Sequence, residues 1–303
     1  MQVTLIGYGE VGRILAEDLR VRGTPVVAFD IHLTAPTSAV SDAMRAHARQ
    51  HGVALADSHV AAVARAQLVV SAVTASQAVA VAEACAAGLA RGTFFLDFNS
   101  ASPGAKIAAG RRVNAVGGRY VEGAVMTSVP PHRLRVPLLL GGPDAAALLP
   151  VLNDLGFAAR LSSERLGVAS ATKMCRSVMV KGLEAMVIEA LTTARHYGVE
   201  DAVIASLKET FPAIDWEKQG AYFFQRVVEH GRRRSEEMRE VAVTVREAGL
   251  EPWSAAGTAE RQAWMADLAD AGVFAGRRSP GFARSADWRI EADRILAQLK
   301  KEH

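Results

Sequence analysis

The sequence predicts an N-terminal α/β Rossmann domain, doubly wound around a mostly parallel sheet, followed by an all-α domain. From residue 2 to about residue 160, short apolar segments alternate with alanine-rich stretches of helical spacing, which is the pattern of successive βαβ units. Beyond Gly156 the strand-like segments stop, and nearly all of the remaining chain has helical spacing. We therefore expect one domain at residues 1–163 and a second at residues 164–303.

Seven segments of the first domain are expected to be strands. Three of them, VTLI, LVVSAV and FFLDF, lack the polar alternation of a half-exposed strand, so helices should cover the sheet on both faces. The seven segments are Val3–Ile6, Val26–Phe29, Val53–Leu55, Leu68–Val73, Phe94–Phe98, Tyr120–Ala124 and Pro137–Leu140.

A single long helix is expected from Leu166 to Tyr197, where the sequence has no proline and one internal glycine. At 1.5 Å per residue it would be about 45 Å long. Apolar residues surround much of its circumference, which predicts a buried central helix and a homodimer formed through the helical domain. Helix breaks are expected at Gly198, Pro212, Gly231, Gly249–Pro252 and Arg278–Gly281.

Composition excludes several classes of protein. The 303 residues hold 35 Lys and Arg against 32 Asp and Glu, so the net charge of +3 is too small to predict nucleic-acid binding. The two cysteines, Cys85 and Cys175, are too few for a disulfide framework and favour the reducing cytoplasm. We expect no secretory signal, because the N-terminus has no basic segment followed by a long apolar one. We expect no membrane span, because polar residues interrupt the longest uncharged stretch.

A glycine-rich loop follows the first expected strand and opens a helix. Its residues are Gly7, Tyr8, Gly9, Glu10, Val11 and Gly12. In this pattern the first glycine permits a tight turn, the second lets backbone N–H groups approach a pyrophosphate, and the third lets helix and strand pack closely. This context predicts a dinucleotide site.

An acidic residue, Asp30, closes the second expected strand. A carboxylate there can accept hydrogen bonds from both ribose hydroxyls of NAD and would repel a 2′-phosphate. We therefore expect NAD as the cofactor. NADP stays possible, because His32 is close enough in sequence to meet a phosphate.

Two further polar segments follow neighbouring strands. Ser71 lies in the last part of the fourth expected strand and Thr74 directly follows it, while Asn99 and Ser100 follow the fifth. The carboxyl ends of strands are where α/β sheets bind ligands, so we expect the first pair to contact cofactor and the second pair to contact substrate.

The chain resembles the β-hydroxyacid dehydrogenase family, which includes 6-phosphogluconate and 3-hydroxyisobutyrate dehydrogenases. Three segments carry the resemblance in order: GYGEVG, DFNSASP and LGVASATKMCRS. The resemblance covers essentially the whole chain and implies that Lys173 is the general acid or base beside a nicotinamide that exchanges hydride with a substrate alcohol. Such a lysine needs a lowered pKa, and the nearby cation of Arg176 together with burial would lower it.

Several positions depart from the family pattern. Met126, Thr127 and Ser128 stand where the family has a Ser-Gly-Gly turn that holds the substrate carboxylate, and Arg176 stands where it has asparagine. Glu236–Met238, preceded by Arg232–Arg234, replace a second family lysine segment. These changes resemble a branch whose C-terminal domain has no assigned function.

Arg176 can hold a carboxylate or phosphate with two hydrogen bonds, so we expect Thr127, Ser128 and Arg176 to bind a small anionic substrate. The alternative for Arg176 is an ion pair with an acid of the helical domain.

The predicted function is hydride transfer between NAD or NADP and a 3-hydroxy acid or related sugar acid. Three alternatives stay open: an oxidative decarboxylase of the 6-phosphogluconate type, an imine reductase, against which the retained Lys173 counts, and a non-catalytic nucleotide-sensing module.

Two groups of charged or metal-ligating residues are given a structural interpretation. His47 and His51, followed by Asp57 and His59, have spacing that suits a metal, but no further motif supports one, so we expect a solvated helix face and no metal. The run Arg232–Arg234 is an anion site in one interpretation and a solvated helix face in the favoured one.

Overall fold

The computed structural model describes residues 1–34, 38–276, 282 and 285–302. The chain divides into two compact units, Met1–Met174 and Cys175–His303. The position between residues 163 and 164, where the sequence places a boundary, is the end of the last strand, β8 (Ala159–Ser163). Helix α8 (Val168–Tyr197) begins in the first unit and continues into the second.

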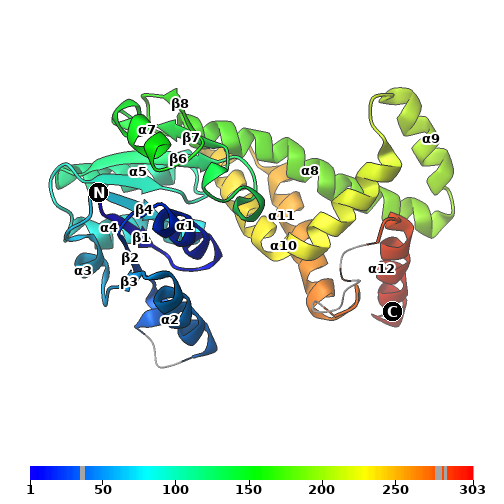
Figure 1. Ribbon diagram of the computed structural model, residues 1–303. Coiled ribbons are helices and arrows are strands. Elements are labelled where there is room, and N and C mark those ends of the chain that lie inside the picture. Colours follow the sequence, from blue (N-terminus) through cyan, green and yellow to red (C-terminus); the bar gives the residue numbers. More distant parts are fainter. Residues whose placement is uncertain (35–37, 277–281, 283–284, 303) are drawn as a thin grey trace. The chain divides into compact units, whose positions relative to one another are not determined.

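The first unit is built on one eight-stranded sheet with the strand order β3-β2-β1-β4-β5-β6-β7-β8 (Figure 1). Within the described residues, β6 and β7 form the one antiparallel pair, so the doubly wound, mostly parallel fold is confirmed. The other strands are β1 (Val3–Ile6), β2 (Val26–Phe29), β3 (Ala54–Leu55), β4 (Leu68–Ser71), β5 (Phe94–Asp97), β6 (Arg119–Val125) and β7 (Leu138–Gly141).

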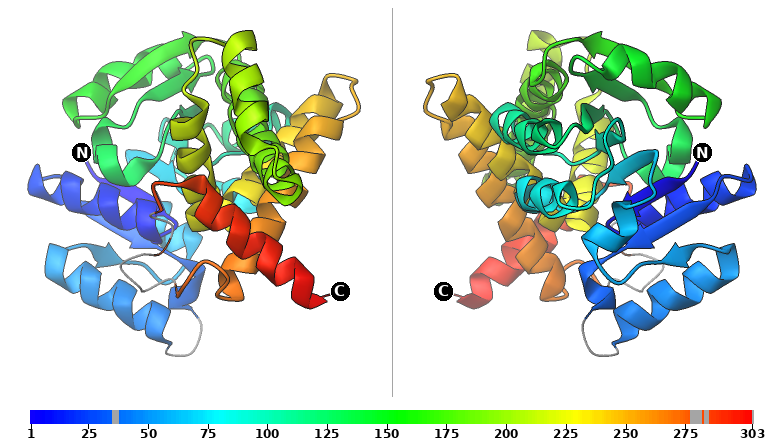
Figure 2. Two further views of the ribbon diagram at one scale, coloured as in Figure 1. Left: turned by 90° about the vertical axis from the view of Figure 1, so that its right-hand side faces the viewer. Right: turned by 90° about the vertical axis from the view of Figure 1, so that its left-hand side faces the viewer.

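Helices cover the sheet on both faces, as the uninterrupted apolar strands predict (Figure 2). One apolar core joins the sheet to α1 (Glu10–Val21), α2 (Ala39–His51) and α7 (Ala145–Asp154). A second core joins the opposite face to α3 (His59–Val63), α4 (Ala78–Ala86) and α5 (Pro103–Ala115). A short helix, α6 (Val129–His132), follows β6.

Strand β8 is the element that sequence analysis missed. Its sequence, ARLSS, carries no apolar run, and none of its residues is buried. It pairs with β7 alone, at the edge of the sheet, so backbone hydrogen bonds rather than side-chain burial define it. The expectation that strands end before Gly156 is therefore wrong.

The second unit is helical, as predicted. After α8 it contains α9 (Glu200–Thr210), α10 (Trp216–Glu247), α11 (Trp253–Asp270) and α12 (Trp288–Glu302). Apolar side chains of all five helices form its core, among them Ile188, Ile204, Phe224, Met265 and Trp288. The predicted breaks at Gly198, Pro212 and Gly249–Pro252 are confirmed, and the break at Arg278–Gly281 lies outside the described residues.

The predicted break at Gly231 is wrong, because Gly231 lies in the middle of α10. A Cβ atom built on it would lie 2.7 Å from the carbonyl oxygen of Gln262 on α11. Glycine at this position therefore allows two helices to approach closely, at the modest cost that glycine carries inside a helix.

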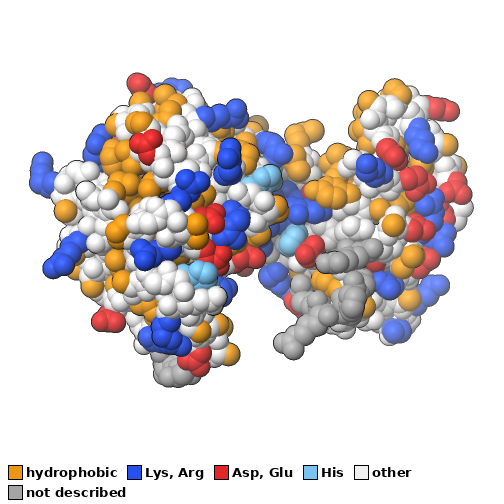
Figure 3. Space-filling view, in the orientation of Figure 1, with side chains coloured by type: hydrophobic (Ala, Val, Ile, Leu, Met, Phe, Trp, Pro, Cys, Tyr) orange, Lys and Arg blue, Asp and Glu red, His pale blue; other side chains and the backbone are white. Residues whose placement is uncertain are grey.

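Acidic and basic side chains are intermingled over each unit on the face drawn in Figure 3. Of the helices in the described residues, none is both long enough and apolar enough to cross a membrane.

Candidate active site

The glycine loop connects β1 to α1 and has the backbone that a dinucleotide loop requires. Gly7 has a φ of +93°, and a Cβ atom on it would lie 2.4 Å from the carbonyl oxygen of Ala72. A Cβ atom on Gly12 would lie 2.1 Å from the carbonyl oxygen of Gly7, whereas one on Gly9 would meet nothing within 4 Å. The loop is thus closely packed at its two ends and open at Gly9, directly before Glu10 and Val11 in the first turn of α1.

Asp30 follows β2 and lies against this loop. Its Oδ2 accepts a hydrogen bond of 2.7 Å from the backbone N–H of Tyr8, and its Oδ1 accepts one of 2.9 Å from that of His32. The carboxylate is therefore held at the carboxyl end of β2, next to the loop, as the motif predicts.

Asn99 connects the ends of β4 and β5. Its Oδ1 accepts a 2.7 Å hydrogen bond from Val73 N–H, and its Nδ2 donates a 3.0 Å bond to Ser71 Oγ. Asn99 and Ser71 are both buried, whereas Thr74, three residues beyond Ser71, is exposed. Asn99 thus braces two strand ends in addition to any contact with a ligand.

Lys173 and Ser100, which are far apart in sequence, meet at this edge of the sheet. Ser100 follows β5, and Lys173 lies in the second turn of α8. Lys173 Nζ donates a hydrogen bond of 2.5 Å to Ser100 Oγ, and both side chains are partly buried. The structure therefore brings together the amine that the resemblance assigns to proton transfer and a hydroxyl expected, from its place after a strand, to contact substrate.

A buried carboxylate, Glu122, fixes the start of α8. It lies in β6, and its Oε1 accepts hydrogen bonds from the backbone N–H groups of Gly167 (2.9 Å) and Ala169 (3.0 Å). Its Oε2 accepts a 2.8 Å bond from the hydroxyl of Ser170. A negative charge at a helix N-terminus also interacts favourably with the helix dipole. Glu122 therefore determines where α8 begins and, five residues further on, where Lys173 is placed.

A second buried network lies beneath Asn99. Lys106 Nζ is 2.9 Å from Asp97 Oδ1, and both side chains are 1% exposed. Tyr120 donates its hydroxyl proton to Asp97 Oδ2 over 2.6 Å, and Asn99 N–H donates to Oδ1 over 2.9 Å. Burial, reinforced by the Asp97 charge, raises the pKa of Tyr120 well above its usual value, so its hydroxyl stays a donor.

Lys106, Tyr120 and Glu122 are not among the site residues that the sequence motifs predict. A signal was available in the strand sequences YVEGAV and FFLDF, where one carboxylate interrupts an otherwise apolar run. Asp97 and Glu122 are direct partners in the β5–β6 register. A charge inside a buried strand requires a partner, which these two networks supply.

The remaining residues predicted to bind substrate are more exposed to solvent than Asn99. Thr127 is exposed and Ser128 partly buried, and both follow β6 at the same edge of the sheet as Ser100. Arg176 lies one turn beyond Lys173 on α8 and is exposed. No acid of the described residues forms an ion pair with it.

The arginine run on α10 is engaged by acids of the second unit. Arg232 donates to Asp267 and Asp270 over 2.6 and 2.8 Å, and Arg233 donates to Glu237 over 2.6 Å. Arg234 is buried and pairs with Glu184. This pairing favours the structural interpretation of the run, with Arg234 in the core instead of on a solvated face.

Two segments of the chain match models of known protein families. Residues 2–158 match the model of the NAD binding domain of 6-phosphogluconate dehydrogenase, and residues 194–265 match a domain of unknown function, DUF1932. A conserved hypothetical protein from Sinorhizobium meliloti 1021 is 34% identical, with 98% of this chain and 96% of that chain covered and a TM-score of 0.78.

Two further solved structures are similar over most of the chain. One is a conserved protein of unknown function, described as structurally similar to 3-hydroxyacid dehydrogenases; it is 29% identical over 89% of this chain and 98% of its own, with a TM-score of 0.70. The other is the 3-hydroxyisobutyrate dehydrogenase of Mycobacterium tuberculosis, which shares the fold at 17% identity, 88% and 94% coverage and a TM-score of 0.70.

These similarities support a nicotinamide cofactor and an NAD-dependent oxidoreductase. The chain belongs to the family that carries the NAD binding domain of 6-phosphogluconate dehydrogenase, and its helical part contains a domain of unknown function.

Proposed function

We propose that the protein is an NAD-dependent dehydrogenase that oxidises the CH–OH group of a small anionic 3-hydroxy acid or sugar acid, or reduces the corresponding ketone. The observation that carries this proposal is the hydrogen bond from Lys173 Nζ to Ser100 Oγ at the carboxyl edge of the sheet. The glycine loop and Asp30 lie at the same edge of the sheet. The Lys173 amine and the dinucleotide loop are therefore both at the edge where α/β sheets bind ligands.

The residues present fit a dinucleotide. The open space at Gly9 leaves room for a pyrophosphate at the N-terminus of α1, where the helix dipole favours an anion. Asp30, held by the N–H groups of Tyr8 and His32, would accept the ribose hydroxyls and disfavour a 2′-phosphate, which is why we propose NAD over NADP. Ser71 is the last residue of β4 and Thr74 lies three residues beyond it, so both would be available to the cofactor at this edge. When bound, the nicotinamide accepts or returns the hydride.

Proton transfer is assigned to Lys173. During oxidation, the neutral amine takes the proton of the substrate hydroxyl, and during reduction the ammonium returns it. Ser100 Oγ accepts a hydrogen bond from Nζ and thereby orients the amine, while Glu122 anchors the helix that carries it. Asn99 holds the strand ends on which Ser100 depends.

An anionic substrate is favoured by Arg176. Within the described residues its guanidinium has no acidic partner, and it lies on the helix that carries Lys173, one turn further on. A guanidinium can hold a carboxylate with two parallel hydrogen bonds, so it would replace the missing Ser-Gly-Gly turn. The hydroxyls of Thr127 and Ser128 would contribute further hydrogen bonds.

The experiment measures NADH and NADPH binding to the wild type and to Asp30→Ala, and then turnover of a panel of hydroxy acids at high pH. We expect NADH-selective binding that Asp30→Ala weakens, and turnover that Lys173→Ala lowers by about 10²-fold or more without loss of NADH binding. Arg176→Met should raise KM for acids and leave NADH affinity unchanged.

The outcomes separate the alternatives. Release of CO2 with each NADH formed would identify an oxidative decarboxylase. NADH binding without turnover of any acid would favour a nucleotide-sensing module. If the wild type binds neither cofactor, the proposal fails.

We also propose that the protein is a cytoplasmic homodimer, associated through its helical unit. Met179 and Met186, on α8, are 72% and 62% exposed, and Trp253 at the start of α11 is 81% exposed. Exposed apolar side chains favour association where they form a continuous patch, and Met179 and Met186 are two helical turns apart on α8. Light scattering should give twice the chain mass for the wild type, and Met186→Lys should shift the equilibrium toward the monomer. A monomeric wild type would contradict this proposal.

A further inference from the structure

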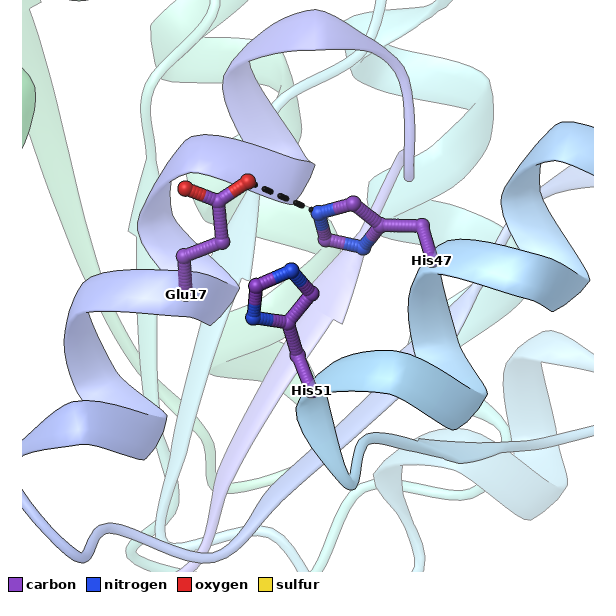
Figure 4. Close-up of side chains that lie close together, drawn as sticks. All are labelled: Glu17, His47 and His51. Carbon is purple, nitrogen blue, oxygen red and sulfur yellow. Dashed lines mark hydrogen bonds and ion pairs between the residues drawn. The ribbon is translucent and has the colours of Figure 1, made fainter.

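Three side chains with metal-ligating atoms converge between α1 and α2, outside the residues assigned to cofactor or substrate. Glu17 comes from α1, and His47 and His51, one turn apart, come from α2 (Figure 4). The side chains point toward one another, and each is partly buried. His59 does not join them, because it packs edge-on against Phe29.

The distances suit a metal ion of the zinc class. His47 Nε2 is 2.9 Å from Glu17 Oε1, and one ligand atom from each of the three residues lies within 4.8 Å of the others. In a tetrahedral site with metal–ligand bonds of about 2.0–2.1 Å, neighbouring ligand atoms are about 3.4 Å apart. That spacing falls between the 2.9 Å of the His47–Glu17 pair and the 4.8 Å limit that contains all three ligand atoms. Small side-chain rotations would therefore complete the site.

The second nitrogen of His47 already has the partner that a metal-binding histidine needs. His47 Nδ1 is 2.8 Å from the hydroxyl of Tyr8. Metal-ligating histidines commonly bind through one ring nitrogen and donate the N–H of the other to an oxygen, which fixes the tautomer and the ring orientation.

His51 distinguishes a metal site from a simple link between two helices. The His47–Glu17 hydrogen bond is enough to join α2 to α1. The His51 ring stacks on His47 at a centroid distance of 4.4 Å, and its nitrogens have no hydrogen-bond partner within the described part of the chain. One nitrogen of the neutral His51 ring is therefore available to bind an ion near His47 and Glu17, with ligand atoms of all three residues within 4.8 Å of one another.

We propose that Glu17, His47 and His51 bind one divalent transition-metal ion, with Zn²⁺ as the best match, and so cross-link α1 to α2. Two imidazoles and one carboxylate form a donor set that favours Zn²⁺ over Mg²⁺ or Ca²⁺, which prefer oxygen ligands. The side chains of His47 and Glu17 are 13% and 28% exposed, so an ion can enter from solvent. Water would occupy the fourth position.

The positive charge of Arg133 should weaken metal binding, because it pairs with the Glu17 carboxylate. Its Nη2 donates to Glu17 Oε2 over 2.6 Å, and its Nε donates to Asp18 over 2.8 Å. The arginine leaves Glu17 Oε1 directed at the histidines but neutralises part of the carboxylate charge. Removing Arg133 should therefore strengthen metal binding, an effect that nonspecific binding to surface histidines would not show.

The experiment titrates tag-free, metal-free protein with Zn²⁺ by calorimetry, and with Co²⁺ by visible absorption, which reports tetrahedral coordination. We expect one equivalent of Zn²⁺ per chain, at least tenfold weaker affinity in His51→Gln, and at least tenfold weaker affinity in Tyr8→Phe. Arg133→Gln should bind more tightly than the wild type. His196→Gln, an exposed histidine of the other unit, is the matched control and should bind like the wild type.

Two results would overturn the proposal. One is the absence of a saturable single-equivalent site in the wild type. The other is an affinity that falls equally in His51→Gln and His196→Gln, or in neither. His51→Gln should fold, because the His51 ring makes no hydrogen bond to any residue that the structure describes; circular dichroism checks this. The gain in Arg133→Gln tests the site independently of any loss.

Discussion

Glu122 and Gly141 lie opposite each other in the antiparallel β6–β7 pair, and the glycine provides the space that the carboxylate occupies. A Cβ atom on Gly141 would lie 2.2 Å from Glu122 Oε1, the oxygen that accepts hydrogen bonds from Gly167 and Ala169. A missing side chain on one strand therefore allows a charge on the next strand to hold the start of the helix that carries Lys173.

The first prediction concerns this space. Gly141→Ala should force the Glu122 side chain away from α8 and lower the free energy of unfolding by about 1–3 kcal/mol, as overpacking does in a close-packed core. Denaturant unfolding measures the change. Gly257→Ala is the control: a Cβ there meets nothing within 4 Å, in the interior of α11, so that variant should gain about 0.5–1 kcal/mol. Equal effects of the two substitutions would contradict the prediction.

The second prediction concerns the buried ion pair of Lys106 and Asp97. Lys106→Met should lower the free energy of unfolding by about 3–5 kcal/mol, because it removes the cation and leaves the Asp97 charge buried beside two neutral donors, the Tyr120 hydroxyl and the Asn99 N–H. Urea denaturation of the variant measures this. Lys218→Met, at an exposed position, should change stability by less than about 0.5 kcal/mol. If Lys106→Met lowers the free energy of unfolding only slightly, the buried ion pair contributes little to stability.

The third prediction is a pH dependence in the helical unit. Arg289 donates two hydrogen bonds to Glu217, of 2.9 and 3.0 Å, and Trp288 Nε1 donates a third of 2.9 Å. Mainly through Arg289, these contacts lower the pKa of Glu217 below its usual value. The stability that Glu217 contributes is therefore fully present above its unfolded-state pKa and is lost as the pH falls through the lower, folded-state pKa.

Glu217→Gln tests this directly. The variant should be less stable than the wild type at pH 7, and the two stability curves should converge as the pH falls below about 4. Thermal unfolding across the pH range gives both curves. A stability difference that stays constant down to the most acidic pH would show that the charge of Glu217 does not contribute.

The fourth prediction concerns the two thiols. Cys85 is buried, and burial raises the pKa of its thiol to about 12, whereas Cys175 is exposed. At pH 8 a disulfide reagent should label one thiol per native chain, since only a thiolate reacts, and a second thiol only after denaturation. Cys175→Ser should abolish the native labelling. Rapid labelling of that variant would mean that Cys85 is accessible.

Local sequence determined the fold class and the cofactor loop. The apolar runs VTLI, LVVSAV and FFLDF specified strands covered on both faces, and the order of strand, glycine loop, helix and Asp30 specified a dinucleotide site. These features could be predicted because each depends on residues near one another in the chain: a φ of +93° at Gly7 and a carboxylate at a strand end are local requirements. The resemblance then pointed to Lys173.

Tertiary structure alone decided which distant residues support that site. Glu122 contacts residues 45 to 48 positions away, and Lys173 meets Ser100 across 73 positions. Sequence spacing holds no information about such pairs, because strand register and helix docking create them. The same holds for Gly231, predicted as a helix break but required for the close approach of α11, and for Glu17 beside His47, where packing of α1 on α2 brings a carboxylate to two imidazoles. A buried charge or an absent side chain acquires its role only when the partner that faces it is known.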